Sequence, residues 1–196
     1  MTLPPLEQKI IDLGYRHLFQ TDREEMEKDI WKSGANQAEL EQIAYSKESS
    51  LRGRFLAAEV LRHFKVEFKP EYTDLLCEAY VNALKETNME GYDWNGLNAN
   101  AWGFLYEHDH TGYVGKQLLL FGEPALPYLT ELLDVEGIVL YEGSQEATLG
   151  NAYGYRIKDF AAFYISKISD LPIQFYQDIE ERDREIERFK KLLKAH

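Results

Sequence analysis

The chain has 196 residues, of which 44% are apolar and 13% aromatic, and a formal net charge of -12. This composition excludes a disordered chain, and a split into two independent domains would leave each half small. The longest apolar stretches, such as residues 117–121, are far too short to cross a bilayer. We therefore expect one soluble globular domain over residues 1–196.

The negative charge is concentrated in one part of the chain. Residues 89–177 contain 12 of the 34 Asp and Glu residues but only 4 of the 22 Lys and Arg residues. A field of this sign repels nucleic-acid phosphates and anionic lipids and attracts basic ligands. We therefore expect no nucleic acid and no membrane among the partners.

The N-terminus and the single cysteine bear on the compartment. The first residues lack the basic region and apolar stretch of a secretory signal peptide, and Cys77 cannot form an internal disulfide. We therefore expect a cytoplasmic protein. Cys77 lies in an apolar helical stripe with no activating neighbour, which predicts a buried, unreactive thiol.

Apolar residues recur at helical spacing throughout the chain, whereas the alternation typical of strands is weak. The sequence therefore predicts an all-α protein. In chain order we expect helices over residues 5–18, 22–32, 37–45, 50–64, 71–86, 99–107, 113–121, 124–133, 155–168 and 174–194. Thr21 and Asn98 are predicted to cap the helices that follow them.

Two of the expected helices match each other. LRGRFLAAEVLRHF (residues 51–64) aligns without gaps on YRIKDFAAFYISKI (155–168), at an offset of 104 residues. The matched positions are Arg52 with Arg156, Arg54 with Lys158, and Ala57 and Ala58 with Ala161 and Ala162. Small residues in mid-helix allow a neighbouring helix to approach closely, and each segment follows a shorter helix. Such a helix pair is the unit of an α-solenoid.

These segments resemble HEAT repeats. GEPALPYLTELLDV followed by YRIKDFAAFYISKI is similar to a repeat whose first helix carries Pro-x-Leu-x-x-Leu-Leu and whose second opens with Arg-x-(Lys/Arg)-Asp-x-Ala-Ala. The similarity is strongest over residues 121–168 and extends to 37–64. The stretch WGFLYEHDHTGYVGKQLLLFGEPALPYLTELLD is also similar to uncharacterised bacterial HEAT-like proteins.

The resemblance implies an armadillo-like α-α superhelix of HEAT-like helix pairs with extra terminal helices, and it implies no activity. Residues 174–195, which carry an apolar stripe and a polar outer face, would form its capping helix. The chain departs from the repeat pattern at two places. Phe55 stands where the other unit has Asp159, and residues 135–153 replace what is usually a tight turn.

Residues 135–153, called the insert below, are the main candidate for a functional surface. Long irregular segments in compact domains are usually functional or disordered, and the glycines and tyrosines of the insert favour packing back on the helices. Its oxygen atoms could recognise an amine, a guanidinium or a metal. The candidate binding residues are Tyr141, Glu142, Ser144, Glu146, Thr148, Tyr153 and Arg156. We expect Glu142 or Glu146 to hold Arg156 and Ser144 to cap a short helix; a purely structural insert is the alternative.

Two other segments carry candidate residues. In EHDHTG (107–112), His108 and His110 could share a divalent metal only in an extended or turn conformation, because on a helix they would point about 200° apart. Imidazoles stabilising a helix C-terminus are the alternative. Trp94 and Trp102 could line a ligand pocket or anchor their loop in the core.

The known nucleophile, phosphate-binding, dinucleotide-binding and zinc-protease motifs do not occur in the sequence, which favours a binding protein over an enzyme. We expect a protein–protein interaction module or scaffold without a cofactor, whose acidic face from residues 89–112 and 135–153 binds a basic partner. The alternative is a small-molecule or divalent-metal-binding protein, or an enzyme, that uses a cleft between residues 92–112 and 137–156. A HEAT-like nucleic-acid enzyme would need a basic concave surface.

Overall fold

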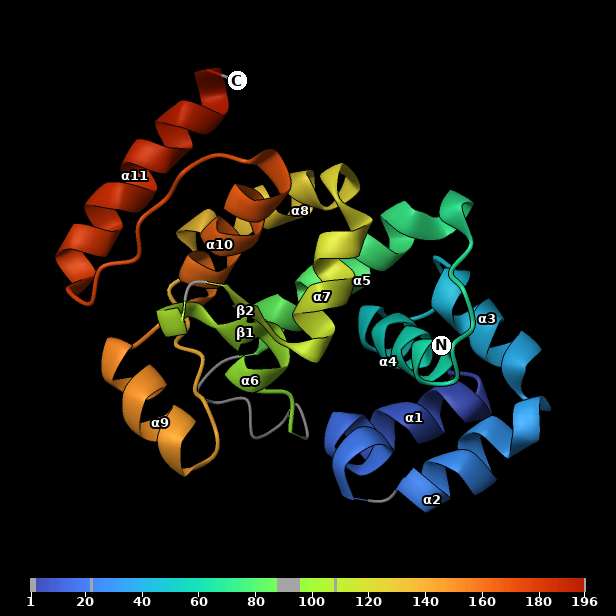
Figure 1. Cartoon of the computed structure of the whole chain (residues 1–196). Coiled ribbons are helices and arrows are strands. Elements are labelled where there is room, and N and C mark those ends of the chain that lie inside the picture. Colours follow the sequence, from blue (N-terminus) through green and yellow to red (C-terminus); the bar gives the residue numbers. More distant parts are fainter. Residues whose placement is uncertain (1–2, 22, 88–95, 108, 196) are drawn as a thin grey trace. The chain divides into compact units, whose positions relative to one another are not determined.

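The computed structural model describes residues 3–21, 23–87, 96–107 and 109–195 and shows an all-α protein with two short strands (Figure 1). The all-α prediction is therefore confirmed. Contacts group the chain into two compact units: unit 1 holds the described residues up to Glu86 together with 96–97, and unit 2 holds Thr87 and those from Asn98 onward. The prediction of a single domain stays a prediction, because this grouping does not show whether the units fold separately.

Unit 1 is built around α4 (Leu51–His63), which packs against α1, α3 and α5. Residues 53–61 of α4 are all buried, including both alanines of the matched pair. The other helices are α1 (Pro5–Arg16), α2 (Arg23–Glu25), α3 (Gln37–Tyr45) and α5 (Thr73–Glu86), with π-helical turns over His17–Thr21 and Met26–Trp31 and 3-10 turns over Lys32–Gly34 and Pro70–Tyr72. The segments α3 and α4 thus form the helix pair expected over residues 37–64.

Local residues explain where the helices of unit 1 begin and end. Ser50 caps α4, since its Oγ accepts a hydrogen bond of 3.0 Å from the backbone N–H of Gly53. In α1, Gly14 adopts a φ of 65°, which interrupts the regular helix and costs a glycine little. The helix expected over residues 5–18 therefore ends at Arg16 and continues as a π-helical turn.

Unit 2 is built around α10 (Ile157–Ser169), which packs against α7, α8 and α11. Residues 157–165 of α10 are all buried. The other elements are α6 (Ala99–Trp102), β1 (Gly103–Phe104), β2 (His110–Thr111), α7 (Tyr113–Phe121), α8 (Leu126–Glu131), α9 (Ser144–Gly150) and α11 (Ile179–Ala195), with 3-10 turns over Leu105–Glu107, Glu123–Ala125, Leu132–Asp134 and Asn151–Tyr153.

Two of the expected helices in unit 2 are wrong in extent. The helix predicted over residues 99–107 ends at Trp102, because the chain turns into an antiparallel pairing of β1 with β2. Gly103 has a φ of 141°, and a Cβ there would lie 2.5 Å from the carbonyl oxygen of His110, so a larger residue would prevent the pairing.

The helix predicted from residue 174 begins at Ile179 instead. The Asp178 carboxylate accepts a hydrogen bond of 2.9 Å from the N–H of Glu181 and so fixes the start of α11. Along this helix Ile186 and Phe189 are buried as the apolar stripe predicts, whereas Ile179 is 48% exposed. The residues between α10 and α11 are irregular chain, not helix.

Other predictions of the fold have mixed outcomes. Asn98 caps α6 as expected, accepting a hydrogen bond of 3.1 Å from Asn100 N, and Cys77 is buried, with its pKa raised to about 12 by burial. Across the described residues, no helix is both long enough and apolar enough to span a bilayer. The superhelical stacking of the two helix pairs stays a prediction.

Candidate functional site

The insert is folded rather than irregular, and it contains a helix. The short helix expected near Ser144 is present as α9, but its N-cap is Gly143, at a φ of 95°, and Ser144 is the first helical residue without a side-chain cap bond. Thr148 donates its hydroxyl to the carbonyl of Ser144 at 2.7 Å, within the same helix. Both hydroxyl residues are exposed on α9.

Tyr141 fastens the insert to the β1–β2 hairpin. Its side chain is 2% exposed, its hydroxyl donates to the carbonyl of Gly103 at 3.0 Å, and it accepts from the N–H of Leu105 at 3.2 Å. The Tyr141 ring lies against Gly150. A Cβ added at Gly150 would be only 2.6 Å from the ring atom Cε2, so a larger residue would not fit there. Burial raises the pKa of Tyr141 far above its ordinary value. Tyr141 therefore anchors the site from within, whereas the sequence suggested a surface contact.

Two asparagines hold the chain on either side of Tyr141. Asn100 donates to the carbonyl of Glu142 at 2.9 Å and accepts from its N–H at 2.8 Å, and Asn151 makes the same pair of bonds with the backbone of Tyr141, at 3.1 and 2.7 Å. Ala99 N–H also donates to the carbonyl of Leu140 at 3.0 Å. The segments between which a cleft was predicted are thus in direct contact over these described residues.

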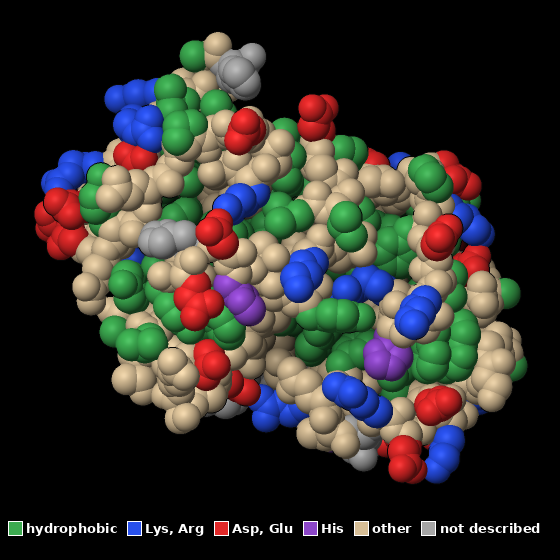
Figure 2. Space-filling model, in the orientation of Figure 1, with side chains coloured by type: hydrophobic (Ala, Val, Ile, Leu, Met, Phe, Trp, Pro, Cys, Tyr) green, Lys and Arg blue, Asp and Glu red, His purple; other side chains and the backbone are tan. Residues whose placement is uncertain are grey.

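The surface above these anchors combines aromatic rings with carboxylates. We define the aromatic–acidic patch as Phe104, Tyr106, Glu107, His110, Glu142, Glu146 and Tyr153. The rings of Phe104 and His110 stack with centroids 4.4 Å apart, and the rings of Tyr106 and Tyr153 lie 6.4 Å apart. The rings of the patch are half-buried or exposed. Figure 2 shows acidic side chains gathered over the β1–β2 hairpin in this part of unit 2.

The carboxylates of the patch act on its central ring. The pKa of Tyr106 is raised, first by burial and then by the negative charges of Glu107 and Glu146. Glu107 belongs to the hairpin and Glu146 to α9, so the fold brings acids from two segments to one ring. The Nδ1 atom of His110 lies 3.7 Å from Glu107 Oε2. The result is a negative field beside exposed aromatic faces, an arrangement that favours a cation.

Among the other candidate residues, Trp102 lies in the core. Trp102 is fully buried and donates its indole N–H to Thr87 Oγ1 at 3.1 Å, so the core alternative holds for this residue. Trp94 and His108 lie outside the described residues. Within the described part of the chain, no group of three or more His, Cys, Asp and Glu side chains could hold a metal ion. Because His108 is not among the residues of that search, the metal site at His108 and His110 stays a prediction.

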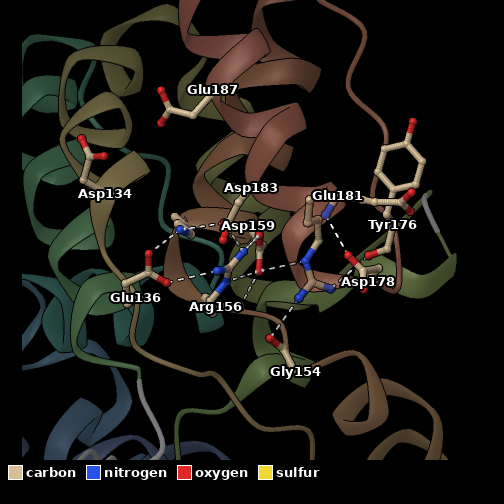
Figure 3. Close-up of polar contacts among 12 residues, drawn as sticks. Asp134, Glu136, Gly154, Arg156, Asp159, Tyr176, Asp178, Glu181, Asp183 and Glu187 are labelled. Atoms are coloured by element: carbon tan, nitrogen blue, oxygen red, sulfur yellow. Dashed lines mark hydrogen bonds and ion pairs between the residues drawn. The ribbon is translucent and has the colours of Figure 1, made fainter.

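Arg156 lies in a buried ion-pair cluster rather than at the patch (Figure 3). Its Nε is 3.1 Å from Asp159 Oδ2, its Nη1 is 3.1 Å from Glu136 Oε2 and its Nη2 is 2.8 Å from Asp183 Oδ1. Lys158 pairs with the same Glu136 and Asp183. The insert acid that holds Arg156 is thus Glu136, where the sequence suggested Glu142 or Glu146.

Arg182 completes this cluster, and the sequence reading missed it. The side chain is fully buried, with its guanidinium 4.8 Å from the centroid of the Tyr155 ring and its Nε 3.5 Å from Asp159 Oδ2. It donates to the carbonyls of Tyr153 at 2.8 Å and Gly154 at 3.2 Å. The available signal was its position in the apolar stripe of α11, where a buried arginine requires acidic or carbonyl partners. The cluster joins α11 to the end of the insert.

Comparisons with protein-family models, with curated proteins and with solved structures each found no match to the chain.

Proposed function

We propose that unit 2 binds a basic segment of a partner protein through the aromatic–acidic patch. The observation that carries this proposal is the pair of half-buried rings of Tyr106 and Tyr153, whose centroids lie 6.4 Å apart. The negative charges of Glu107 and Glu146 act on the Tyr106 ring and add to the effect of burial in raising its pKa. A Lys or Arg side chain laid across this ring would gain a cation–π contact and a charge-assisted hydrogen bond together. Arginine would gain more, since its planar group also stacks on aromatic faces.

The anchors beneath the patch support a preformed binding surface. Asn151 and Asn100 fix the backbone of Tyr141 and of Glu142, and the Tyr141 side chain is itself anchored, before any partner arrives. A surface that is already ordered loses less conformational entropy on binding than a loop that must fold around its ligand. We therefore expect the patch to keep its backbone conformation when a basic segment binds.

The excess of acids in residues 89–177 also favours a basic partner. Residues 89–177 contain only 4 basic residues, and two of these, Arg156 and Lys158, are buried in ion pairs with acids. A third, Lys167, pairs with the exposed Asp109 at 3.1 Å. The carboxylates of the patch would speed the encounter with a basic segment at low salt.

A binding assay with defined peptides tests the proposal. Fluorescein-labelled peptides of alternating Arg and Ser, Lys and Ser, or Glu and Ser are titrated with the full chain, and Kd is measured by fluorescence anisotropy at low and at physiological salt. We expect binding of the basic peptides, tightest for Arg. The double variant Glu142→Gln and Glu146→Gln should raise Kd by about tenfold or more, equal to about 1.4 kcal/mol.

The matched control removes the same charge elsewhere in unit 2. Glu123→Gln with Glu131→Gln changes two exposed acids outside the patch, so its Kd should stay within about twofold of the wild type. Tyr106→Leu should weaken binding of the Arg peptide more than that of the Lys peptide. If the patch variant and the control variant lost the same affinity for the basic peptides, the peptides would respond to net charge alone. The proposal would then be wrong.

A further inference from the structure

Unit 1 contains a pocket that is separate from the patch and from every candidate residue in the sequence. Its volume is about 350 Å³, at the lower end of the range for small-molecule sites. It lies between the start of α1, the second half of α3 and the turn before α4. The lining residues are Leu3, Pro4, Glu7, Glu39, Gln42, Ile43, Ser46, Glu48 and Ser49.

Glu7 is the buried charged residue of this pocket. Its side chain has no exposed surface, and its Oε1 accepts hydrogen bonds from Ser50 N at 2.8 Å and Ser50 Oγ at 2.9 Å. The other oxygen, Oε2, is also buried and has no hydrogen-bond partner among the described residues. A buried acceptor without a partner is unfavourable, and more so when the group is charged. Most buried polar groups in native proteins have a partner, so an unpartnered oxygen that lines a pocket calls for an explanation such as a bound ligand.

The surroundings of Glu7 hold its carboxylate in this position. Ser50, which donates to Glu7, is also the N-cap of α4, so the carboxylate lies near a helix N-terminus that stabilises negative charge. Gly53 leaves room for it, because a Cβ there would lie 2.7 Å from Glu7 Cγ and closer still to Oε1. The hydrogen-bond donors to Oε1 are neutral groups, so they satisfy one oxygen without supplying a countercharge.

We propose that this pocket binds a small organic amine, whose ammonium group donates to Oε2 of Glu7. Leu3, Pro4 and Ile43 would contact a short alkyl chain, and the acids Glu39 and Glu48 make the lining attractive to a cation. No Lys or Arg lines the pocket as described, which excludes an anion as the favoured ligand. A primary ammonium suits the site better than a quaternary one, because Oε2 lacks a hydrogen-bond donor.

An NMR titration of the full chain with n-butylammonium chloride tests this site. We expect saturable amide shifts at Gln42, Ile43 and Ser49, with weaker binding of butyltrimethylammonium and no shifts at these residues with butyrate or 1-butanol. Glu7→Gln keeps the size of the side chain but removes its charge, and it should weaken butylammonium binding by about tenfold or more.

A second variant keeps the test decisive, because Glu7→Gln also alters the bonds to Ser50. Gln42 is an exposed residue of α3 that lines the pocket, so Gln42→Trp should block the pocket and abolish the shifts at Ile43 and Ser49 while α3 stays folded. Glu67→Gln, an exposed acid outside the pocket, should leave binding unchanged. The proposal is overturned if butylammonium gives no saturable shifts in the wild type, or if Gln42→Trp retains wild-type affinity.

Discussion

The helices α4 and α10 occupy the same place in their respective units, yet their N-termini are built differently. Their buried stretches, residues 53–61 and 157–165, align at the same offset of 104 as the matched sequences. At the position where α10 has Asp159, α4 has Phe55, and both side chains are fully buried. The two helices thus share a buried packing surface of the same length but differ in the chemistry at their first turns.

Each N-terminus nevertheless has a buried carboxylate, supplied in a different way. In α10 it is Asp159, which accepts from the N–H of Arg156 at 2.8 Å and pairs with the side chains of Arg156 and Arg182. In α4 it is Glu7, which comes from α1 and has neutral partners on one oxygen. The carboxylate of Asp159 is neutralised by two arginines and stabilises the fold. The carboxylate of Glu7 has one oxygen that remains available to a ligand.

The largest expected effect comes from removing the carboxylate of Asp159. Asp159→Ala leaves Arg182 buried without its acidic partner and removes the bonds to the Arg156 side chain. Breaking a buried ion pair from one side typically costs about 3–5 kcal/mol. We expect a loss of that size in the free energy of unfolding, measured by urea denaturation followed by circular dichroism.

An exposed acid on α11 provides the control for Asp159→Ala. Glu180→Ala changes a solvent-exposed residue in the first turn of that helix and should alter the free energy of unfolding by less than about 0.5 kcal/mol. Similar losses for the two variants would show that Asp159 is no more important than a surface carboxylate. The contrast between the two N-termini would then have no energetic basis.

A smaller effect is expected at the other N-terminus, where Gly53 makes room for Glu7. Gly→Ala inside a helix normally stabilises by about 0.5–1 kcal/mol. At Gly53, in the first turn of α4, the added Cβ would press on the Glu7 carboxylate, and overpacking costs about 1–3 kcal/mol. We therefore expect Gly53→Ala to destabilise the protein by about 1 kcal/mol. In a Glu7→Ala background the same substitution should stabilise it, which a double-mutant cycle with urea denaturation measures.

The informative result of that cycle is whether Gly53→Ala raises or lowers the free energy of unfolding. If Gly53→Ala stabilises the protein even when Glu7 is present, the carboxylate is free to move away, and it is not held in the pocket by its surroundings. Additive effects of the two substitutions would lead to the same conclusion.

Sequence patterns predicted the parts of the fold that depend on local signals. The bounds of α3 and α7 agree with those expected, because each helix has a clear apolar period and lies between residues that break helices. The burial of the alanine pairs in α4 and α10 also follows from the internal match. Cap residues such as Asn98 were predictable because the bond they make spans a few residues.

Features that depend on contacts distant in sequence were not predictable. The β1–β2 hairpin replaces the end of an expected helix because Tyr141, 36 residues from Leu105, bonds to that segment. Glu7 occupies the first turn of α1, where an acid normally faces solvent, and its burial depends on Ser50, 43 residues away. Arg182 differs, because its place in an apolar stripe was visible and only its partners were hidden.

The smallest effect is a pH dependence at the exposed end of the α10 cluster. The side chains of Arg156 and then Lys158 lower the pKa of Asp183 from 3.8 to about 2, although burial opposes this change. Because the folded-state pKa lies below the ordinary value, the stabilisation from Asp183 is present above about pH 4 and is lost as the pH falls through about 2. Asp183 is 43% exposed, so screening by solvent limits this contribution to less than about 1 kcal/mol.

Asp183→Asn therefore should lower the free energy of unfolding near neutral pH and have little effect near pH 2, as measured by urea denaturation at both pH values. Glu7 has no basic partner of this kind among the described residues, so Glu7→Gln should not reproduce that pattern through the loss of an ion pair. If Asp183→Asn lowered stability equally at both pH values, the ion pair with Arg156 would not be its cause. The lost interaction would then be one that does not depend on the charge of Asp183, and packing and neutral hydrogen bonds would account for its contribution to the cluster at α10.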